Sequence, residues 1–391
     1  MGDAFDPYGF SGLGRNEMKP AKIALRALLT LILLAWPAFA QDASSDTPSN
    51  PPANAIKGRS IVVIPMIFYT PETRWSGGIG GIYTFHPSWS RDLSRPSSLQ
   101  FSGIFTQNHQ FALNIKPEIY LGNSTAQLLA NLDIKHYPDT FFGVGNDTRA
   151  AAEELYTQNS LSVEVSFLKR VWPGKRIYAG LTYGGDYCRF RNFAPVGALA
   201  GGSVPGSQGG LTSGLAATLK LDDRDNIFYP TRGNYLLVSA DFHSAIIGSD
   251  YGYLKLKADC RKYFLIFRTH VLAFQAVFQA GAGTVPFMAL PKLGGDGILR
   301  GTNSSRFRDR VLAAAQVEYR LPVWWRFKVV GFAGLGEVAG RLGRLSLAGL
   351  KYSLGFGLRF NIVPSEGMNL RLDRGFGPAS SGSYFLGGEA F

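Results

Sequence analysis

The chain has 391 residues and a net charge of +12; only 17% of its residues are charged, while 13% are aromatic. Much aromatic content and little charge argue against a disordered protein, and the presence of only two cysteines argues against a disulfide-rich scaffold. The positive charge is spread along the chain without any nucleic-acid-binding motif, so nucleic acid is not expected as a partner.

The beginning of the chain has the pattern of a secretory signal peptide. Basic residues precede a short apolar run at 27–36, and Ala38-Phe39-Ala40 provides a small-residue cleavage site. We predict a cleaved signal at 1–40, with Met18 as the true start, and therefore an exported protein. A single membrane anchor is the alternative, for which the apolar run is short.

After the signal the composition changes twice. Residues 41–59 are rich in Ser, Pro, Asn and Asp, which is typical of a flexible leader. From residue 60 onward polar and apolar residues alternate with a period of two, as in SLSVEVSF at 160–167, which indicates strands with one apolar face. Sixteen such segments are predicted, at 60–68, 74–86, 98–108, 110–121, 124–137, 154–172, 175–189, 209–223, 233–246, 252–266, 268–282, 310–323, 326–341, 350–363, 367–377 and 382–391.

The connections between these segments indicate which kind of β protein this is. The three longest, 138–153, 190–208 and 283–309, are all odd-numbered, whereas most even-numbered ones are tight turns. Long loops on one side and short turns on the other are typical of an outer-membrane barrel. Sixteen strands enclose a lumen that side chains cannot fill, so the polar face should line water and the apolar face should contact lipid. We predict an all-β fold, a 16-stranded antiparallel transmembrane β-barrel over 60–391; a soluble two-sheet sandwich is the alternative.

Five motifs resemble one family when they are taken in order. They are FFGVGNDT at 141–148, DDRDNIFYPTRG at 222–233, LGGDGILRG at 293–301, VEYRLP at 317–322 and YFLGGEAF at 384–391. Together they resemble the BamA/TamA family, the bacterial surface antigen barrels. The resemblance covers nearly all of the exported chain and implies location in the bacterial outer membrane.

The resemblance implies that the sixth extracellular loop folds into the lumen. Its motif residues here are Gly294, Gly295, Arg300 and Gly301, and the arginine would bind acidic groups of the inner wall. Glu318 is the expected partner, because it lies on the polar face of the next strand. The family has a second carboxylate in an F-x-D-x-G pattern, but Gly334 stands in its place, so we expect a weaker or rearranged lock. The alternative for Arg300 is a solvated loop arginine.

Two further motifs belong to the same resemblance. The charged periplasmic turn includes Asp223, Arg224, Asp225, Pro230 and Gly233. Its two interpretations are a strand lock or partner contact, and an Asp/Pro/Gly turn with local ion pairs, which we favour. The chain also ends like a barrel-assembly signal, with Tyr384 and the aromatic Phe391.

Nothing in the sequence indicates catalysis or a bound cofactor. There is no G-x-S-x-G or H-E-x-x-H motif, and the five histidines have no metal-ligand spacing. The protein is therefore not expected to be an enzyme, and neither a metal nor another cofactor is predicted.

The functional prediction follows from what the family does and from what this chain lacks. Members that assemble or translocate proteins carry periplasmic POTRA modules, and 41–59 is too short for one. The first hypothesis is a barrel that assists insertion or export of proteins at a weak seam between its first and last strands. The alternatives are a passive or loop-gated pore, with Lys255 and Lys257 in its lumen, and a structural surface antigen. Expected partners are outer-membrane lipids including lipopolysaccharide, the machinery that inserts the barrel itself, and client or POTRA-bearing proteins.

Overall fold

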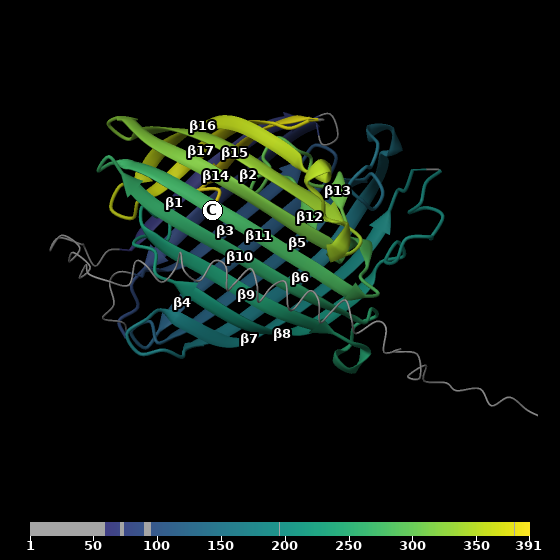
Figure 1. The fold of residues 1–391 in the computed structure, drawn as a ribbon, viewed down its shortest axis with the longest axis horizontal. Helices are drawn as coiled ribbons and strands as arrows, with labels where there is room; N and C mark the ends of the chain where they lie inside the picture. The colour runs from purple at the N-terminus through teal and green to yellow at the C-terminus, as the bar shows by residue number, and fades with distance from the viewer. Residues whose placement is uncertain (1–58, 71–73, 90–94, 195, 379) are drawn as a thin grey trace, which may run out of the picture.

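A sixteen-stranded antiparallel sheet curves into a barrel (Figure 1). The computed structural model describes residues 59–70, 74–89, 95–194, 196–378 and 380–391. The predicted signal peptide and nearly all of the predicted leader lie outside these ranges. Within the described ranges no helix is long and apolar enough to cross a membrane.

The strands follow one another around the barrel in chain order. They are β1 (Ser60–Thr70), β2 (Arg74–Phe85), β3 (Ser97–Thr106), β4 (Phe111–Leu121), β5 (Ala126–Phe141), β6 (Glu154–Arg170), β7 (Ile177–Arg191), β8 (Gly210–Asp222), β9 (Gly233–His243), β10 (Tyr253–Ile266), β11 (His270–Gly283), β14 (Val311–Trp324), β15 (Phe327–Ala339), β16 (Lys351–Val363), β17 (Met368–Phe376) and β18 (Ser381–Gly387). Each of the sixteen predicted segments overlaps one of them, so the predicted fold class is confirmed. A separate pair, β12 (Lys292–Leu293) and β13 (Phe307–Arg308), lies in the connection between β11 and β14.

The alternating sequence produces a wall that is apolar outside and polar inside. In β6, Leu161, Val165 and Phe167 are exposed, while Ser160 and Ser166 are buried. A soluble protein would bury the first set and expose the second. The reversed arrangement is what a barrel surrounded by lipid requires.

Every strand pairs with its neighbours in the sequence, and β11 pairs with β14 across the long connection. The two edges of the sheet are β1 and β18, and no ladder joins them within the described residues. The register of the last strands positions the candidate site, because it sets Phe332 opposite Glu318 and Asp373 opposite Gly357. The connections after β5, β7, β11 and β15 define what we call the long-loop end, and the opposite end is the short-turn end.

The lumen is not an open channel near the long-loop end. The connection 284–310, here called the inner loop, folds back into the barrel and carries β12 and β13 (Figure 1). Its Phe287 packs edge to face against Phe141 and Tyr156 on the inner wall. The expectation of a water-lined interior is therefore wrong for this end, where an apolar core occupies the space. The periodicity of the strands could not show this, because the core is built by a loop.

Candidate functional site: a charged network inside the barrel

The arginine of the inner loop is completely buried between two carboxylates. Arg300 Nη2 lies 2.7 Å from Glu318 Oε2 of β14, and Nη1 lies 2.6 Å from Asp373 Oδ2 of β17. The guanidinium carbon also lies 3.5 Å from the ring centre of Phe332 in β15. Two charge-assisted hydrogen bonds and a cation–π contact therefore fix the tip of the loop to three strands.

The two carboxylates belong to a larger set of ion pairs. Arg320 Nε lies 2.8 Å from Glu318 Oε1, and Arg359 Nη1 lies 2.5 Å from Asp373 Oδ1. Arg359 Nε in turn lies 2.7 Å from Glu389 Oε2. We call the whole set the lock network, which consists of Asp296, Arg300, Glu318, Arg320, Arg359, Arg371, Asp373 and Glu389. Its arginines and carboxylates are equal in number, and all but the exposed Asp296 are buried, so the cost of burying these charges is offset by opposite ones.

The glycine after Arg300 ties the loop tip to the last strand. The N–H of Gly301 donates to the Tyr384 hydroxyl at 2.9 Å, and its carbonyl oxygen accepts from Ser380 Oγ at 2.7 Å. Gly301 has a φ of +103°, and a β-carbon there would overlap main-chain atoms of Gly375 in β17. Only glycine meets both conditions, so the R-G order of the motif has a direct physical reason.

The remaining glycines of the motif stand at the base of the tip. Gly294 follows β12 directly, and the N–H of Gly295 donates to the Thr302 carbonyl oxygen at 2.9 Å. This bond closes the segment that presents Arg300. The hydroxyl of Ser305 then donates to Asp139 of β5 at 2.6 Å, so the inner loop also contacts the opposite part of the wall.

Arg320 joins the lock network to the short-turn end of the barrel. Its Nη1 donates to the Pro230 carbonyl oxygen at 3.3 Å, and its Nη2 donates to the main-chain oxygen of Phe391 at 3.1 Å. The rings of Tyr229 and Tyr263 flank the same guanidinium. One buried arginine thus contacts the β8–β9 turn and the residues after β18, while it shares Glu318 with Arg300.

The β8–β9 turn is built mostly by its own side chains. Arg224 Nε lies 2.8 Å from Asp222 Oδ1, and Asp225 Oδ1 accepts from the N–H of Thr231 at 2.9 Å. Asp223 accepts from the N–H of Asn234, directly after Gly233. These local contacts are the ones expected of an Asp/Pro/Gly turn with local ion pairs. The bond from Arg320 to Pro230 adds a long-range contact, which is what the strand-lock interpretation supposes.

The two aromatic residues predicted as an assembly signal do not face lipid. The last strand was predicted to reach residue 391, but β18 ends at Gly387, and Phe391 is only 4% exposed beside Tyr263 and Ala273. Tyr384 points inward to Gly301. The outward aromatic residue of β18 is Phe385, which is 48% exposed. The chain turns inward after β18, where Gly388 has a φ of +86°.

Sequence reasoning did not assign several members of the site. Asp373 supplies the second carboxylate, which the family pattern places at the position of Gly334. Gly334 itself faces Leu299 of the inner loop. Phe332 is the aromatic residue of the F-x-D-x-G pattern, and the sequence does not indicate that its ring contacts Arg300. Asp373 could have been found, since it lies on the polar face of a predicted strand.

Comparison with known proteins agrees with this architecture. The Omp85 superfamily domain matches residues 95–380. Among solved structures, BamA from Haemophilus ducreyi lacking POTRA domains 1–3 is similar, with 16% identity, a TM-score of 0.53, and coverage of 84% of this chain and 70% of that chain. CdiB from Acinetobacter baumannii has 13% identity, a TM-score of 0.48, and coverage of 82% and 56%.

The domain match is the comparison that assigns the family. The search of curated proteins finds no match. The likeness to BamA shows a common fold at low identity. Because the domain match spans well over half of the chain, the protein belongs to the Omp85 superfamily of outer-membrane β-barrels.

Proposed function

We propose that this barrel assists the insertion or export of other proteins at the seam between β1 and β18. The observation that carries the proposal is the position of the inner-loop tip. Arg300 is bound to Glu318 and Asp373 of the wall, while the adjacent Gly301 is bound to Tyr384 of β18. The loop that occupies the lumen therefore also holds one edge of the seam.

The edges of the sheet suit an incoming strand. β18 has seven residues, whereas β5 has 16 and β6 has 17, and within the described residues β18 pairs with β17 alone. An unpaired strand edge offers a row of main-chain donors and acceptors to another chain. A client strand adding to β1 or β18 would satisfy these groups within the membrane, where unpaired groups are costly.

Passage through the lumen would require movement at both ends. The apolar core around Phe287 fills the long-loop end, and the β8–β9 turn with Phe391 lies across the inner wall at the other. The shared contacts of Arg320 and Glu318 connect the two closures. Release of Arg300 would therefore loosen both, which is the role we assign to the lock network.

A loop-gated pore is the second candidate function. Lys255, proposed as a lumen cation, donates to the Ala289 carbonyl oxygen of the inner loop at 3.1 Å, and Lys257 lies 3.0 Å from Asp241. Withdrawal of the inner loop would free Lys255 and widen the lumen. This favours a gated pore over a passive one.

The test uses the purified protein in liposomes with an unrelated outer-membrane barrel as client. Folding of the client is followed by its change in gel mobility before and after heating. We expect faster folding with the protein present, and a loss of that acceleration in Arg300→Ala. Arg306→Ala is the matched control, because Arg306 lies in the same loop and, within the described part of the chain, has no carboxylate partner: it donates to the Thr148 carbonyl oxygen and lies over the rings of Phe142 and Phe307.

One outcome would contradict the insertion function, and a second would contradict the role assigned to the lock network. Equal client folding with and without the protein would remove the insertion function. Equal acceleration by wild type and Arg300→Ala would leave insertion possible without the lock. If the client is unaffected while planar bilayers show conductance that rises in Arg300→Ala, the pore is the better assignment.

A further inference from the structure

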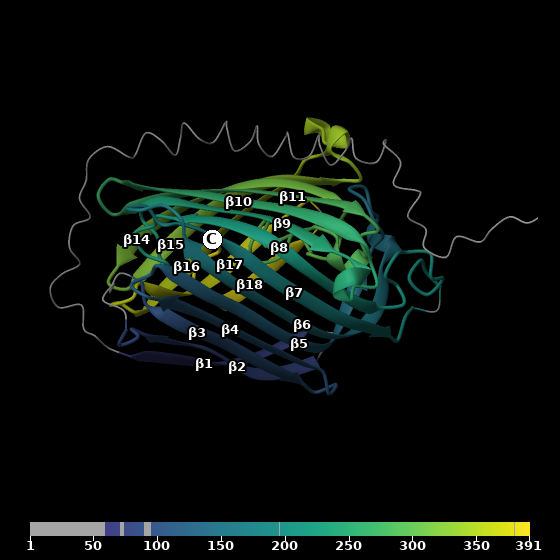
Figure 2. The same cartoon turned by 90° about the horizontal axis from the view of Figure 1, so that it is seen from below.

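The connection between β15 and β16 lies on the outside of the barrel. Residues 340–350 form two short 3-10 turns, η6 (Leu342–Arg344) and η7 (Leu347–Gly349), which project from the wall near the long-loop end (Figure 2). Leu342 and Leu345 pack against Ala258 and Phe278 on the outer face. We call this segment the outer-wall loop. It rests on the surface that the membrane covers.

Specific hydrogen bonds hold the outer-wall loop in place. Glu337 Oε2, at the end of β15, accepts from the N–H of Ser346 at 2.8 Å. Asn146 Nδ2, from the β5–β6 connection, donates to the Gly349 carbonyl oxygen at 2.8 Å. Both bonds therefore hold the second turn, η7, while the first turn is held by the packing of Leu342 and Leu345.

The exposed side of the outer-wall loop is both apolar and cationic. Leu347 is 88% exposed, and Arg341 and Arg344 are exposed beside it. Arg310 is also exposed and adjoins Asp309, whose carboxylate lies against Gly340. Within the described residues no ion pair joins the guanidinium group of any of these three arginines to a carboxylate. We refer to Arg310, Arg341 and Arg344 as the arginine patch.

Asp309 offsets only part of this charge. Burial raises the pKa of the Asp309 carboxyl, although Arg310 and Arg344 act in the opposite direction. Arg310 and Arg344 act on this one carboxylate and Arg341 adds a third positive charge, so the patch stays positive whichever form Asp309 takes. A positive patch beside an exposed leucine, both at a membrane surface, is complementary to an anionic lipid headgroup.

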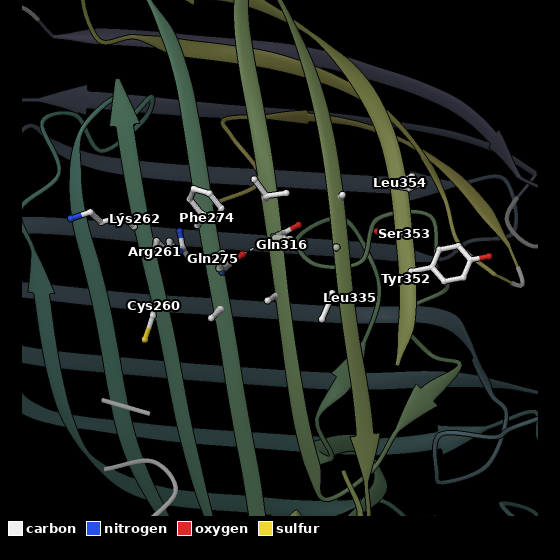
Figure 3. A pocket seen from close by; sticks show the side chains of 15 residues that line it. Cys260, Arg261, Lys262, Phe274, Gln275, Gln316, Leu335, Tyr352, Ser353 and Leu354 are labelled. Atoms are coloured by element: carbon white, nitrogen blue, oxygen red, sulfur yellow. Dashed lines mark hydrogen bonds between the residues drawn. The ribbon is translucent and has the colours of Figure 1, made fainter. Parts of the chain in front are cut away.

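A groove on the outer wall adjoins the footprint of this loop. It measures about 700 Å³ and crosses β10, β11, β14, β15 and β16 (Figure 3). Ala276 and Ala315 line it, two positions along their strands from the residues that the loop covers. Phe274 and Tyr352 also line it, and Tyr352 projects from the wall in Figure 3. Small side chains therefore lie between larger ones along the groove.

We propose that the arginine patch and this groove together bind an acyl lipid with phosphate in its headgroup, from the leaflet at the long-loop end. The planar guanidinium groups donate paired hydrogen bonds to phosphate oxygens. Leu347 enters the hydrocarbon, and one acyl chain lies in the groove. The site requires only that the barrel spans a membrane, so it stands independently of the client-handling function.

The test measures lipid retention by the purified protein. Diphosphoryl lipid A is added to the protein in neutral detergent micelles, with phosphatidylcholine as competitor, and bound lipid is counted by native mass spectrometry. We expect lipid A to be retained over phosphatidylcholine. The double variant Arg341→Gln/Arg344→Gln should bind roughly thirtyfold more weakly, the product of two surface-charge contributions. Arg149→Gln, at an exposed arginine of another long connection, should bind like wild type.

A second variant tests the groove separately. Ala315→Trp fills it without touching the arginine patch, and should also reduce retention of lipid A. Heat-dependent gel mobility shows whether each variant is folded. Unchanged retention in the double glutamine variant, or equal retention of lipid A and phosphatidylcholine, would overturn the proposal. Neither result would alter the client-folding assay, so the two proposals fail separately.

Discussion

The main-chain N–H of Gly301 donates a 2.9 Å hydrogen bond to the hydroxyl of Tyr384, so the tip of the inner loop is attached to the last strand of the barrel. The neighbouring Arg300 reaches Glu318 of β14 and Asp373 of β17. A single turn of chain therefore contacts four of the last five strands, because Arg300 also lies over Phe332 of β15. Any movement of the loop is transmitted to the edge of the sheet at β18.

Arg300→Ala should destabilise the barrel strongly. It leaves two buried carboxylates without one of their partners, and breaking a buried ion pair in this way costs about 3–5 kcal/mol. The measurement is the urea concentration at which heat-dependent gel mobility is lost. Arg306→Ala should shift this midpoint less, because within the described residues it removes no ion pair, only a bond to a main-chain oxygen and contacts with the rings of Phe142 and Phe307. Equal shifts in both variants would show that the ion pairs of Arg300 stabilise the barrel no more than the contacts of Arg306 do.

Arg300 and Asp373 should be energetically coupled. A double-mutant cycle with Arg300→Ala and Asp373→Asn should give an interaction energy of roughly 0.5–3 kcal/mol, since the residues are in contact. The comparison cycle pairs Arg300→Ala with Asp259→Asn, whose ion pair is with Arg261 of β10. That second cycle should be additive. Coupling of the same size in both cycles would point to a global change in the barrel.

Gly301→Ala should undock the loop tip without removing a charge. The β-carbon would overlap the main chain of Gly375, and the φ of +103° is unfavourable for alanine. Planar bilayers should show more frequent opening in this variant than in wild type. Gly297→Ala is the matched control in the same loop, because a β-carbon there has no neighbour within 4 Å. Identical traces for the two variants would argue against gating by the tip.

Acid should weaken the part of the network that holds the residues after β18. Burial acts to raise the pKa of Glu389, but Arg320 and Arg359 hold it below its usual range. The ionised form therefore stabilises the fold above the ordinary glutamate pKa of about 4.3, and that contribution is lost as the pH falls through the lower, folded value. Glu389→Gln should flatten the loss of stability in this acid range. Parallel curves for wild type and variant would contradict this assignment.

Phe391→Ala distinguishes a packing role of this residue in the folded barrel from a role as an assembly signal. If Phe391 serves mainly to pack against Tyr263, its removal should lower stability of the refolded protein by about 3–5 kcal/mol. Phe385→Ala removes an outward aromatic residue of β18 and should cost less in detergent. Normal stability of Phe391→Ala in vitro, combined with poor insertion in cells, would favour the signal.

The fold could be predicted because the residue pattern of each strand depends only on what its own two faces contact. Alternation in a segment such as Ser160–Phe167 is set by the wall alone, since one face meets lipid and the other the lumen. The strand boundaries agree within three residues for the same reason, except where β5 continues to Phe141 and where β18 ends at Gly387. The two exceptions differ in kind, because β18 ends early. There the Gly-Gly pair allowed the chain to turn inward, and the terminal aromatic pattern did not reveal its direction.

The site could be predicted only in part. Arg300 and Glu318 were paired from a motif resemblance and from adjacent segments of the chain. The alternation of its strand places Asp373 on the polar face, but Asp373 lies 73 residues after Arg300 and nothing in the sequence pairs the two. The apolar core around Phe287 was missed because a loop, not a strand, supplies it.

The balance of charges in the lock network has a consequence for how the loop tip responds to a field. The tip contributes one cation, Arg300, and one anion, Asp296, while the wall keeps equal numbers of both. Its withdrawal therefore carries no net charge along the axis of the barrel, and an applied potential does almost no work on it. Undocking of this tip should depend on binding events and hardly at all on voltage.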